Sequence, residues 1–176
     1  MKSICVIGTG YVGLVTGACF AELGHRVTCV DIDAAKIASL RKGMLPIYEP
    51  GLEPLVHRHL ESGRLSFTTA LQKGMEGADF VFMCVGTPAT EEHQADLSYL
   101  YKAYLDVGSL VSGGHAILVN KSTIPPGTTE LTASILARML NGSGAPPVVA
   151  NPEFLREGHA VSDFMKPIRV VIGASD

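Results

Sequence analysis

Three glycines and one aspartate near the amino terminus have the spacing of a dinucleotide-binding turn. Gly8, Gly10 and Gly13 follow a short apolar run, and Asp31 ends the next one. Gly8 permits a tight turn, Gly10 lets the backbone approach a pyrophosphate, and Gly13 lets the following helix pack close to the strand. A carboxylate at position 31 can accept hydrogen bonds from both ribose hydroxyls. The sequence therefore predicts a nucleotide-binding βαβ unit.

Three more irregular segments carry polar side chains directly after predicted strands. They are Gly86-Thr-Pro88, Lys121-Ser-Thr-Ile-Pro-Pro-Gly127 and Asn151-Pro-Glu-Phe-Leu-Arg-Glu157. Parallel strands end along one edge of a sheet, where ligands bind, so the segments are predicted to converge on one cleft with the glycine turn. Their prolines also suit ordinary strand exits. A further loop, Pro46-Ile-Tyr-Glu-Pro-Gly51, could contact a substrate or a partner domain, or form a turn with Tyr48 packed on the surface.

The rest of the chain supplies elements that can position these segments. Short apolar or β-branched runs alternate with amphipathic stretches of helical length, which is typical of a parallel sheet covered by helices. Strands are predicted at residues 3–8, 26–31, 65–68, 80–85, 116–120, 148–150 and 169–172. Helices are predicted at residues 12–23, 33–41, 51–62, 70–75, 97–110 and 128–140. We expect one α/β domain over residues 1–176, a Rossmann-type, doubly wound, mostly parallel sheet with helices on both faces.

Composition narrows the possible partners. The 176 residues are 47% hydrophobic and 18% charged, with a net charge of −3, which suits one domain with a substantial core. The absence of a basic stripe argues against nucleic acid, and no apolar run is long enough to span a membrane. The four cysteines lie in apolar segments without a Cys-x-x-Cys pair, so neither a metal site nor a disulfide framework is predicted. We expect reduced, buried thiols in a cytoplasmic protein.

Five motifs, in this order, resemble the N-terminal domain of the UDP-glucose/GDP-mannose dehydrogenases. They are Gly8-Thr-Gly-Tyr-Val-Gly13, Pro46-Ile-Tyr-Glu-Pro-Gly51, Val85-Gly-Thr-Pro88, Lys121-Ser-Thr-Ile-Pro-Pro-Gly127 and Asn151-Pro-Glu-Phe-Leu-Arg-Glu-Gly158. The tail, Asp163-Phe164 with Pro167-Ile-Arg-Val-Val-Ile-Gly173, is closer to the branch that acts on UDP-glucose than to the branch that acts on GDP-mannose. The resemblance implies NAD as cofactor and a nucleotide sugar, UDP-glucose in this branch, as substrate. It also implies oxidation of the sugar C6 alcohol to a carboxylate by two NAD through a cysteine-linked thioester.

The resemblance assigns roles to individual positions. Glu153 is expected to be the carboxylate that acts on water or the sugar hydroxyl, and Thr123 to line the reaction centre. The residues expected to hold NAD are Gly8, Gly10, Tyr11, Val12, Gly13, Asp31, Lys36, Thr87, Ser122, Thr123 and Glu157. Those expected to touch the nucleotide sugar are Glu153, Phe154, Leu155, Arg156 and Glu157. From the residues alone, Glu153 could instead cap a helix that starts after Pro152, and Thr123 could satisfy the loop backbone.

The resemblance covers only the first part of the family pattern. The nucleophilic cysteine and most of the sugar pocket are expected in a central helix and a second domain after Asp176, and family members assemble as homo-oligomers through that helix. This chain alone is therefore expected to bind NAD without completing the oxidation. Three alternatives remain open. They are a dehydrogenase for GDP-mannose or UDP-N-acetylmannosamine, a β-hydroxyacid dehydrogenase, which would lack segment 151–157, and a stand-alone NAD-sensing module.

Overall fold

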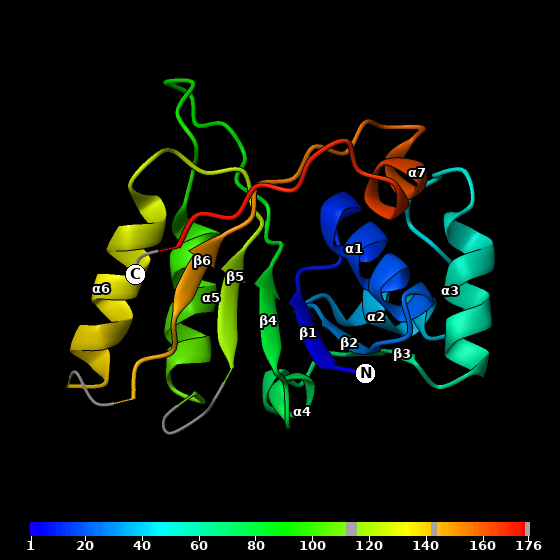
Figure 1. Ribbon diagram of the computed structural model, residues 1–176, viewed down its shortest axis with the longest axis horizontal. Coiled ribbons are helices and arrows are strands. Elements are labelled where there is room, and N and C mark those ends of the chain that lie inside the picture. The colour runs from blue at the N-terminus through cyan, green and yellow to red at the C-terminus, as the bar shows by residue number, and fades with distance from the viewer. Residues whose placement is uncertain (112–115, 142–143, 175–176) are drawn as a thin grey trace.

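One parallel sheet runs through the molecule. The computed structural model describes residues 1–111, 116–141 and 144–174. The strands are β1 (Ser3–Ile7), β2 (Arg26–Val30), β3 (Leu65–Thr68), β4 (Phe80–Met83), β5 (Ile117–Asn120) and β6 (Val148–Ala150). Their order is β3-β2-β1-β4-β5-β6, and each neighbouring pair is parallel (Figure 1). The sheet grows in one direction from β1 to β3 and in the other from β4 to β6, which confirms the predicted doubly wound Rossmann-type fold.

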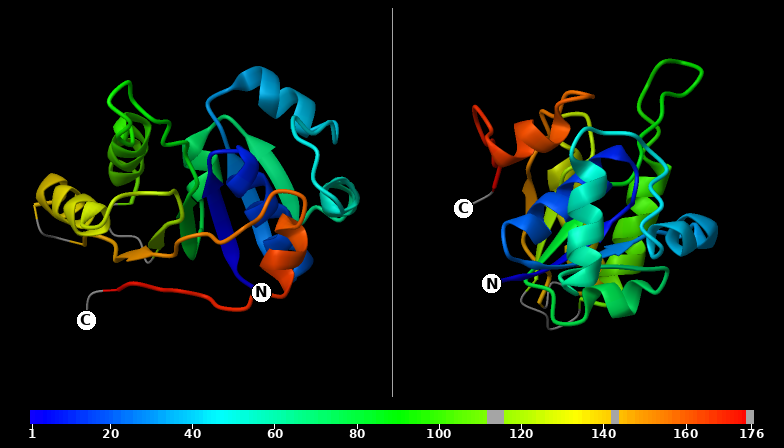
Figure 2. Two further views of the ribbon diagram at one scale, coloured as in Figure 1. Left: turned by 90° about the horizontal axis from the view of Figure 1, so that it is seen from above. Right: turned by 90° about the vertical axis from the view of Figure 1, so that its right-hand side faces the viewer.

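Helices cover both faces of this sheet (Figure 2). They are α1 (Tyr11–Glu22), α2 (Ala34–Leu40), α3 (Leu52–Glu61), α4 (Leu71–Met75), α5 (Ser98–Gly108), α6 (Thr128–Met139) and α7 (Ala160–Met165). Side chains of α1, α3 and α7 join one core cluster, and those of α4, α5 and α6 join the other. None of the helices in the described ranges is both long and apolar enough to cross a membrane.

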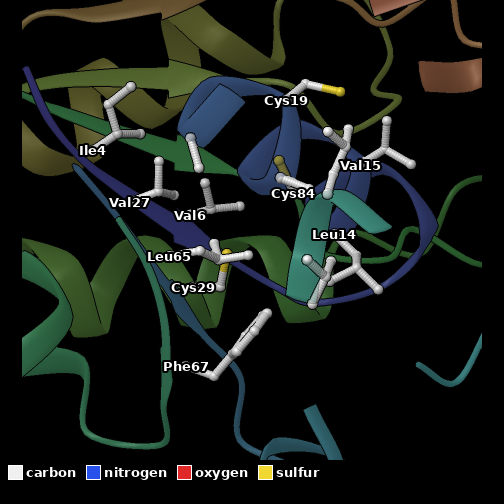
Figure 3. Packing of buried hydrophobic residues seen from close by; sticks show 14 of the residues in the cluster. Ile4, Val6, Leu14, Val15, Cys19, Val27, Cys29, Leu65, Phe67 and Cys84 are labelled. Carbon is white, nitrogen blue, oxygen red and sulfur yellow. The ribbon is translucent and has the colours of Figure 1, made fainter. Parts of the chain in front are cut away.

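The strands are apolar on both faces because both faces are covered. In β1, Ile4 and Val6 point into the cluster with α1, whereas Cys5 and Ile7 point into the cluster with α5. This alternation follows from the two-residue period of a strand, and buried parallel strands read as continuous apolar runs for the same reason. Figure 3 shows the first cluster, in which side chains from β1, β2 and β3 meet those of α1. The core therefore packs α1 against both β1 and β2, the two strands on either side of it in the sequence.

The carboxyl-terminal segment differs from the prediction. Its β-branched residues predict a strand at 169–172, but residues 169–172 are irregular, and only Gly173 pairs with Ala150 in an isolated antiparallel bridge. Val170 and Ile172 are exposed, so this run lacks the packed face that makes such residues favour a strand. The strand prediction is wrong for that reason. The short helix α7, which no periodic pattern predicts, precedes this run.

The carboxyl ends of the strands place the polar segments along one edge of the sheet. Residues 8–13 follow β1, 84–97 follow β4, 121–127 follow β5, and 151–159 follow β6. In Figure 1 this edge is the upper one, where the loops after β4, β5 and β6 leave the sheet on the same side as the start of α1. The topology thus brings together segments that are far apart in the sequence.

Candidate functional site

The glycine turn shows why each glycine is present. Gly8 has a φ of +96°, and a Cβ there would lie 2.4 Å from the carbonyl oxygen of Cys84. A Cβ on Gly13 would lie 2.0 Å from the carbonyl oxygen of Gly8, so glycine is needed for α1 to approach the turn. A Cβ on Gly10 would meet no protein atom within 4 Å. The space outside Gly10 is therefore open to a ligand, as the approach of a pyrophosphate requires.

The amino terminus of α1 can bind the phosphates of such a ligand. Gly10 is its N-cap and forms no side-chain hydrogen bond, and the first turn carries no acidic residue. The N–H groups of Tyr11, Val12 and Gly13 have no acceptor within the helix, as in the first turn of any helix. These N–H groups and the aligned peptide dipoles attract anions. The turn fits a dinucleotide with its pyrophosphate at Gly10.

Asp31 is held by four donors at the end of β2. The backbone N–H and the hydroxyl of Thr9 donate to Oδ2 at 2.8 and 2.7 Å, and the N–H of Asp33 donates to Oδ1 at 3.0 Å. Lys36 Nζ lies 3.0 Å from Oδ2. Burial acts to raise the pKa of Asp31, but the hydrogen bonds from Thr9, Asp33 and Lys36 outweigh it and lower the pKa. The carboxylate therefore stays ionised and positioned to accept ribose hydroxyls.

Lys36 is closer to Asp31 than the sequence suggests. Residues 32–35 contain no cation, which predicts an unscreened carboxylate facing the ribose. Asp33 caps α2 by accepting a hydrogen bond from the N–H of Lys36. The first turn of that helix then brings the Lys36 ammonium back to the Asp31 carboxylate. Lys36 thus contacts Asp31, the carboxylate that is expected to bind the ribose. This contact reduces the repulsion that Asp31 would exert on a 2′-phosphate.

A cavity of about 320 Å³ continues from the glycine turn past Asp31. Apolar side chains from the end of β2, from α4 and from α5 line it together with two charged groups, namely Ile32, Leu71, Tyr99, Ala103, Lys102 and Asp106. A flat base fits such a mainly apolar slot next to a ribose site. The prediction missed these residues because they come from three separate elements, and no spacing in the sequence links them.

The loops after β4 and β5 are tied together. Thr87 Oγ1 donates to the carbonyl oxygen of Thr123 at 2.8 Å. The Ser122 hydroxyl is buried and donates to the carbonyl oxygens of Val85 at 2.8 Å and Met83 at 3.2 Å. Ser122 therefore joins the ends of two strands, and its hydroxyl faces the backbone of β4. Thr123, in contrast, is exposed at the edge.

A second cavity, of about 470 Å³, lies between the loops after β5 and β6 and the first turn of α6. Thr123 and Glu153 both line it, together with Pro125, Gly127 and Pro152. The glycine turn and Gly86 line the first cavity instead. The predicted single cleft is therefore two cavities along one edge, and the bond between Thr87 and Thr123 marks their junction.

Glu153 lies in an irregular segment. Its Oε2 accepts the N–H of Leu155 at 2.6 Å, and the next helix, α7, begins only at Ala160. The alternative in which Glu153 caps a helix that starts after Pro152 is wrong, because no helix starts there. Glu153 is half-buried and faces the second cavity with Thr123. A carboxylate in this position can accept a proton from a bound alcohol or water.

The residues after Glu153 point in different directions. Phe154 is 48% exposed and stacks with the Arg169 guanidinium, 4.9 Å from the ring centroid. Leu155 packs against the core cluster of α1. Arg156 Nη2 lies 2.7 Å from Asp163 Oδ1 in α7, and Glu157 is exposed. Within this run, the side chains of Phe154, Arg156 and Glu157 are therefore accessible, and Asp163 holds the exposed Arg156 guanidinium.

Glu49 is a site residue that the sequence interpretation missed. It is 4% exposed. Its carboxylate accepts the Tyr11 hydroxyl at 2.5 Å, the Gly158 N–H at 2.8 Å and the Ala160 N–H at 2.9 Å. Burial acts to raise the pKa of Glu49, but these hydrogen bonds outweigh it and lower the pKa. Through Glu49, the loop 46–51 thus binds the segment after β6. Tyr48, on the same loop, is 89% exposed.

Lys121 is a second buried charge at this edge. It is 6% exposed, and its Nζ donates to Asn151 Oδ1 at 3.3 Å. Burial lowers the pKa of Lys121, although the nearby Cys84 and Glu153 act in the opposite direction. The ammonium thereby ties the end of β5 to the start of the segment that carries Glu153. Among the described residues, no cluster of His, Cys, Asp or Glu is arranged to hold a metal ion.

Comparison with known proteins assigns this site to a family. The model of the UDP-glucose/GDP-mannose dehydrogenase family, NAD binding domain, matches residues 2–176. The chain belongs to this family. Its cofactor is therefore NAD, and the turn, Asp31 and the adjoining cavity form a site that fits it.

Relatives in this family are much longer than this chain. The UDP-glucose 6-dehydrogenase TuaD of Bacillus subtilis is 47% identical over 175 residues, which are 99% of this chain and 38% of that protein. The UDP-glucose 6-dehydrogenase of Pseudomonas aeruginosa is 48% identical over 177 residues, covering 98% of this chain and 39% of that protein. The structure of a UDP-glucose dehydrogenase from Pyrobaculum islandicum has a TM-score of 0.93 and 46% identity, with 100% and 41% of the two chains covered. The chain thus spans about two fifths of these relatives.

Substitution of two glycines should separate folding from cofactor binding. Gly13→Ala should destabilise the protein by about 2 kcal/mol or more, because its Cβ overlaps the Gly8 carbonyl. Gly10→Ser should keep the melting temperature, since serine suits an N-cap, but should weaken NAD binding about tenfold or more by filling the phosphate space. Thermal melts and calorimetric titration with NAD test both variants. Normal NAD affinity in Gly10→Ser would contradict the placement of the pyrophosphate.

Cofactor choice should depend on Asp31 and Lys36 together. We expect NAD to bind more tightly than NADP by about 2 kcal/mol or more, because Asp31 repels a 2′-phosphate. Lys36→Met should raise the ratio of NAD affinity to NADP affinity by about fivefold, because it removes the cation beside the carboxylate. Calorimetry with both cofactors measures the ratio, and Lys42→Met, at an exposed lysine after α2, is the control. Tighter NADP binding in Lys36→Met would refute this role of Lys36.

Proposed function

We propose that this chain is the NAD-binding part of a UDP-glucose 6-dehydrogenase, which oxidises the C6 alcohol of UDP-glucose to a carboxylate with two NAD. The observation that carries the proposal is the position of Thr123 and Glu153. Both line a cavity next to the dinucleotide site, at the junction formed by Thr87 and Thr123. A dinucleotide with its ribose at Asp31 and its phosphates at Gly10 extends towards that junction.

Within this proposal, the chain binds the cofactor and removes a proton. NAD held at the glycine turn and Asp31 would supply the hydride acceptor for C6. The Glu153 carboxylate accepts the proton of the C6 hydroxyl, and later a proton of water. Its Oε1 is the free oxygen for this step, because only Oε2 accepts a hydrogen bond from the described part of the chain. Thr123 lines the same cavity, and its hydroxyl orients the substrate oxygen or the water.

The nucleophile for a thioester comes from outside this chain. Burial raises the pKa of the Cys5, Cys19 and Cys84 thiols to about 12, and Cys29 is completely buried. A thiol is a nucleophile only as an accessible thiolate. We therefore place the reactive cysteine, and most of the sugar pocket, in the part of the relatives that this chain does not span.

The segment after β6 forms the substrate side of the site in this proposal. Phe154 and Glu157 are accessible to a nucleotide sugar and to the cofactor, whereas Leu155 and the Arg156 guanidinium hold the segment on the protein. We further propose a cytoplasmic, homo-oligomeric enzyme. Four unpaired cysteines support a reducing compartment.

Identity to relatives favours UDP-glucose over other nucleotide sugars. The GDP-mannose dehydrogenase of Pseudomonas aeruginosa has the same TM-score of 0.93 but only 35% identity, covering 99% of this chain and 41% of that one. The three UDP-glucose dehydrogenases compared above are 46–48% identical. A stand-alone NAD sensor would share the cofactor site, but it would have no use for a carboxylate and a hydroxyl facing a second cavity.

Cofactor binding and turnover should separate between this chain and a longer protein, called the longer product, in which this chain is followed by the rest of the family pattern. The 176-residue chain should bind NAD and produce no UDP-glucuronate, because no accessible thiol is available for acyl transfer. The longer product should form two NADH for each UDP-glucose and little NADH with GDP-mannose or UDP-N-acetylmannosamine. Calorimetry and NADH absorbance measure these outcomes. Preference for another sugar in the longer product would refute the UDP-glucose assignment, and sustained turnover by this chain would refute the missing nucleophile.

Glu153 and Thr123 should affect chemistry more than folding. In the longer product, Glu153→Gln and Thr123→Ala should each lower turnover about 100-fold, the effect of losing a positioned proton acceptor or hydroxyl. Melting temperatures should change little, because neither side chain lies in the core. Thr123→Ser should retain most activity, and Glu92→Gln, at an exposed loop, should behave as wild type. Near-normal turnover in Glu153→Gln, whether or not stability falls, would reject the catalytic role.

A further inference from the structure

A single buried carboxylate joins three segments that belong to different parts of the site. Glu49 comes from the loop before α3, and its oxygens accept hydrogen bonds from the glycine turn and from the segment after β6. Oε2 binds the Tyr11 hydroxyl and the Gly158 N–H, whereas Oε1 binds the Ala160 N–H. No other carboxylate in the described ranges bonds to donors of both the glycine turn and the segment after β6.

Tyr11 connects this carboxylate to the dinucleotide. It is the first residue of α1, directly after Gly10, so its backbone N–H belongs to the phosphate-binding turn. Its side chain leaves the turn in the other direction, reaching Glu49 and lying 3.5 Å from the carbonyl oxygen of Arg156. One residue therefore contacts both the cofactor space, through its backbone, and the segment after β6, through its phenol.

The segment after β6 depends on few contacts at this point. Residues 151–156 are irregular, and residues 156–159 are exposed. The N–H groups of Gly158 and Ala160 both donate to the Glu49 carboxylate. The Arg156 N–H and guanidinium donate to the Asp163 carboxylate of α7. The helix α7 has only six residues, too few to be stable by itself. Glu49 is thus a principal anchor for residues 156–160.

We propose that Tyr11 and Glu49 are a positioning pair through which occupation of the dinucleotide turn orders residues 156–160. The relevance to catalysis rests on the proposed function, because this segment follows Glu153 and carries Glu157. A pyrophosphate bound by the first turn of α1 restrains the Tyr11 backbone, and the restrained phenol holds the Glu49 carboxylate in its bonded rotamer. The carboxylate then holds the Gly158 and Ala160 N–H groups. Because such coupling is reciprocal, order in this segment also favours cofactor binding.

A purely structural role for Glu49 has a different signature. A static clamp would protect the Gly158 and Ala160 amides equally with and without NAD. Loss of Tyr11 hydroxyl contact would then change both states alike. A positioning pair instead produces a difference between the two states, and that difference disappears when the phenol is removed. The difference is the quantity to measure.

Amide hydrogen exchange on the 176-residue chain, with and without saturating NAD, tests the pair. In the wild type, NAD should slow exchange at Gly158 and Ala160 about fivefold or more, within the usual range of coupling between sites. Tyr11→Phe should lose this NAD-dependent slowing and bind NAD severalfold more weakly, since it lacks the hydroxyl that donates to Glu49. Tyr48→Phe is the matched control, because Tyr48 lies on the same loop as Glu49 but is 89% exposed. It should keep the full slowing.

Three results would overturn the proposal. They are NAD binding to the wild type without slower exchange at Gly158 and Ala160, the same slowing in Tyr11→Phe, and loss of the slowing in Tyr48→Phe. Each leaves the proposed function intact, because that function requires NAD binding and not this coupling. Tyr11→Phe keeps the ring and the backbone contacts, so the test does not depend on Glu49→Gln, which removes a buried charge. In the longer product, Tyr11→Phe should raise the KM for UDP-glucose more than it lowers kcat.

Discussion

The carbonyl oxygen of Gly8 lies where a side chain at Gly13 would have to be, and this contact sets the position of α1. Because α1 sits so close, its free N–H groups open onto the space outside Gly10. The same turn carries Thr9, whose backbone and hydroxyl hold Asp31. It also sends the Tyr11 phenol to Glu49. A small displacement of α1 would therefore disturb the space outside Gly10, the hydrogen bonds that hold Asp31 and the contacts of Glu49 with the segment after β6 together.

Most of the fold was predictable because its strands are buried on both faces. Continuous apolar runs such as those of β1 and β4 are typical of buried parallel strands, and here they alternate with helical segments. The run 169–172 has the same residue types, yet composition alone does not provide a packed partner. The helix α7 was not predictable, since tertiary contacts hold it: its apolar side chains pack against the core cluster of α1, and the Ala160 N–H donates to Glu49.

The site was predictable where one short motif contains all the residues that shape it. The glycine turn is such a case, because steric demands at Gly8 and Gly13 leave a local trace in the sequence. The slot beside Asp31 leaves no such trace, since α4 and α5 reach it from elsewhere in the chain. The role of Glu49 was not predictable from its neighbours in the sequence. Prolines and an exposed Tyr48 suggest a surface turn, whereas the neighbouring carboxylate is buried and bonded across the molecule.

Two buried charges hold the segment that carries Glu153. The Lys121 ammonium binds Asn151 at its start, and the Glu49 carboxylate binds Gly158 and Ala160 at its end. Burying a charge is costly unless it has partners, so a displacement of either end leaves a charge exposed to an apolar interior. Apolar packing alone would let the segment slide along the protein, because many positions of the segment bury a similar area. The hydrogen bonds to Lys121 and Glu49 form in only a few of these positions. The segment can therefore remain irregular, with accessible side chains, and still keep Glu153 at a defined place in the cavity that Thr123 also lines.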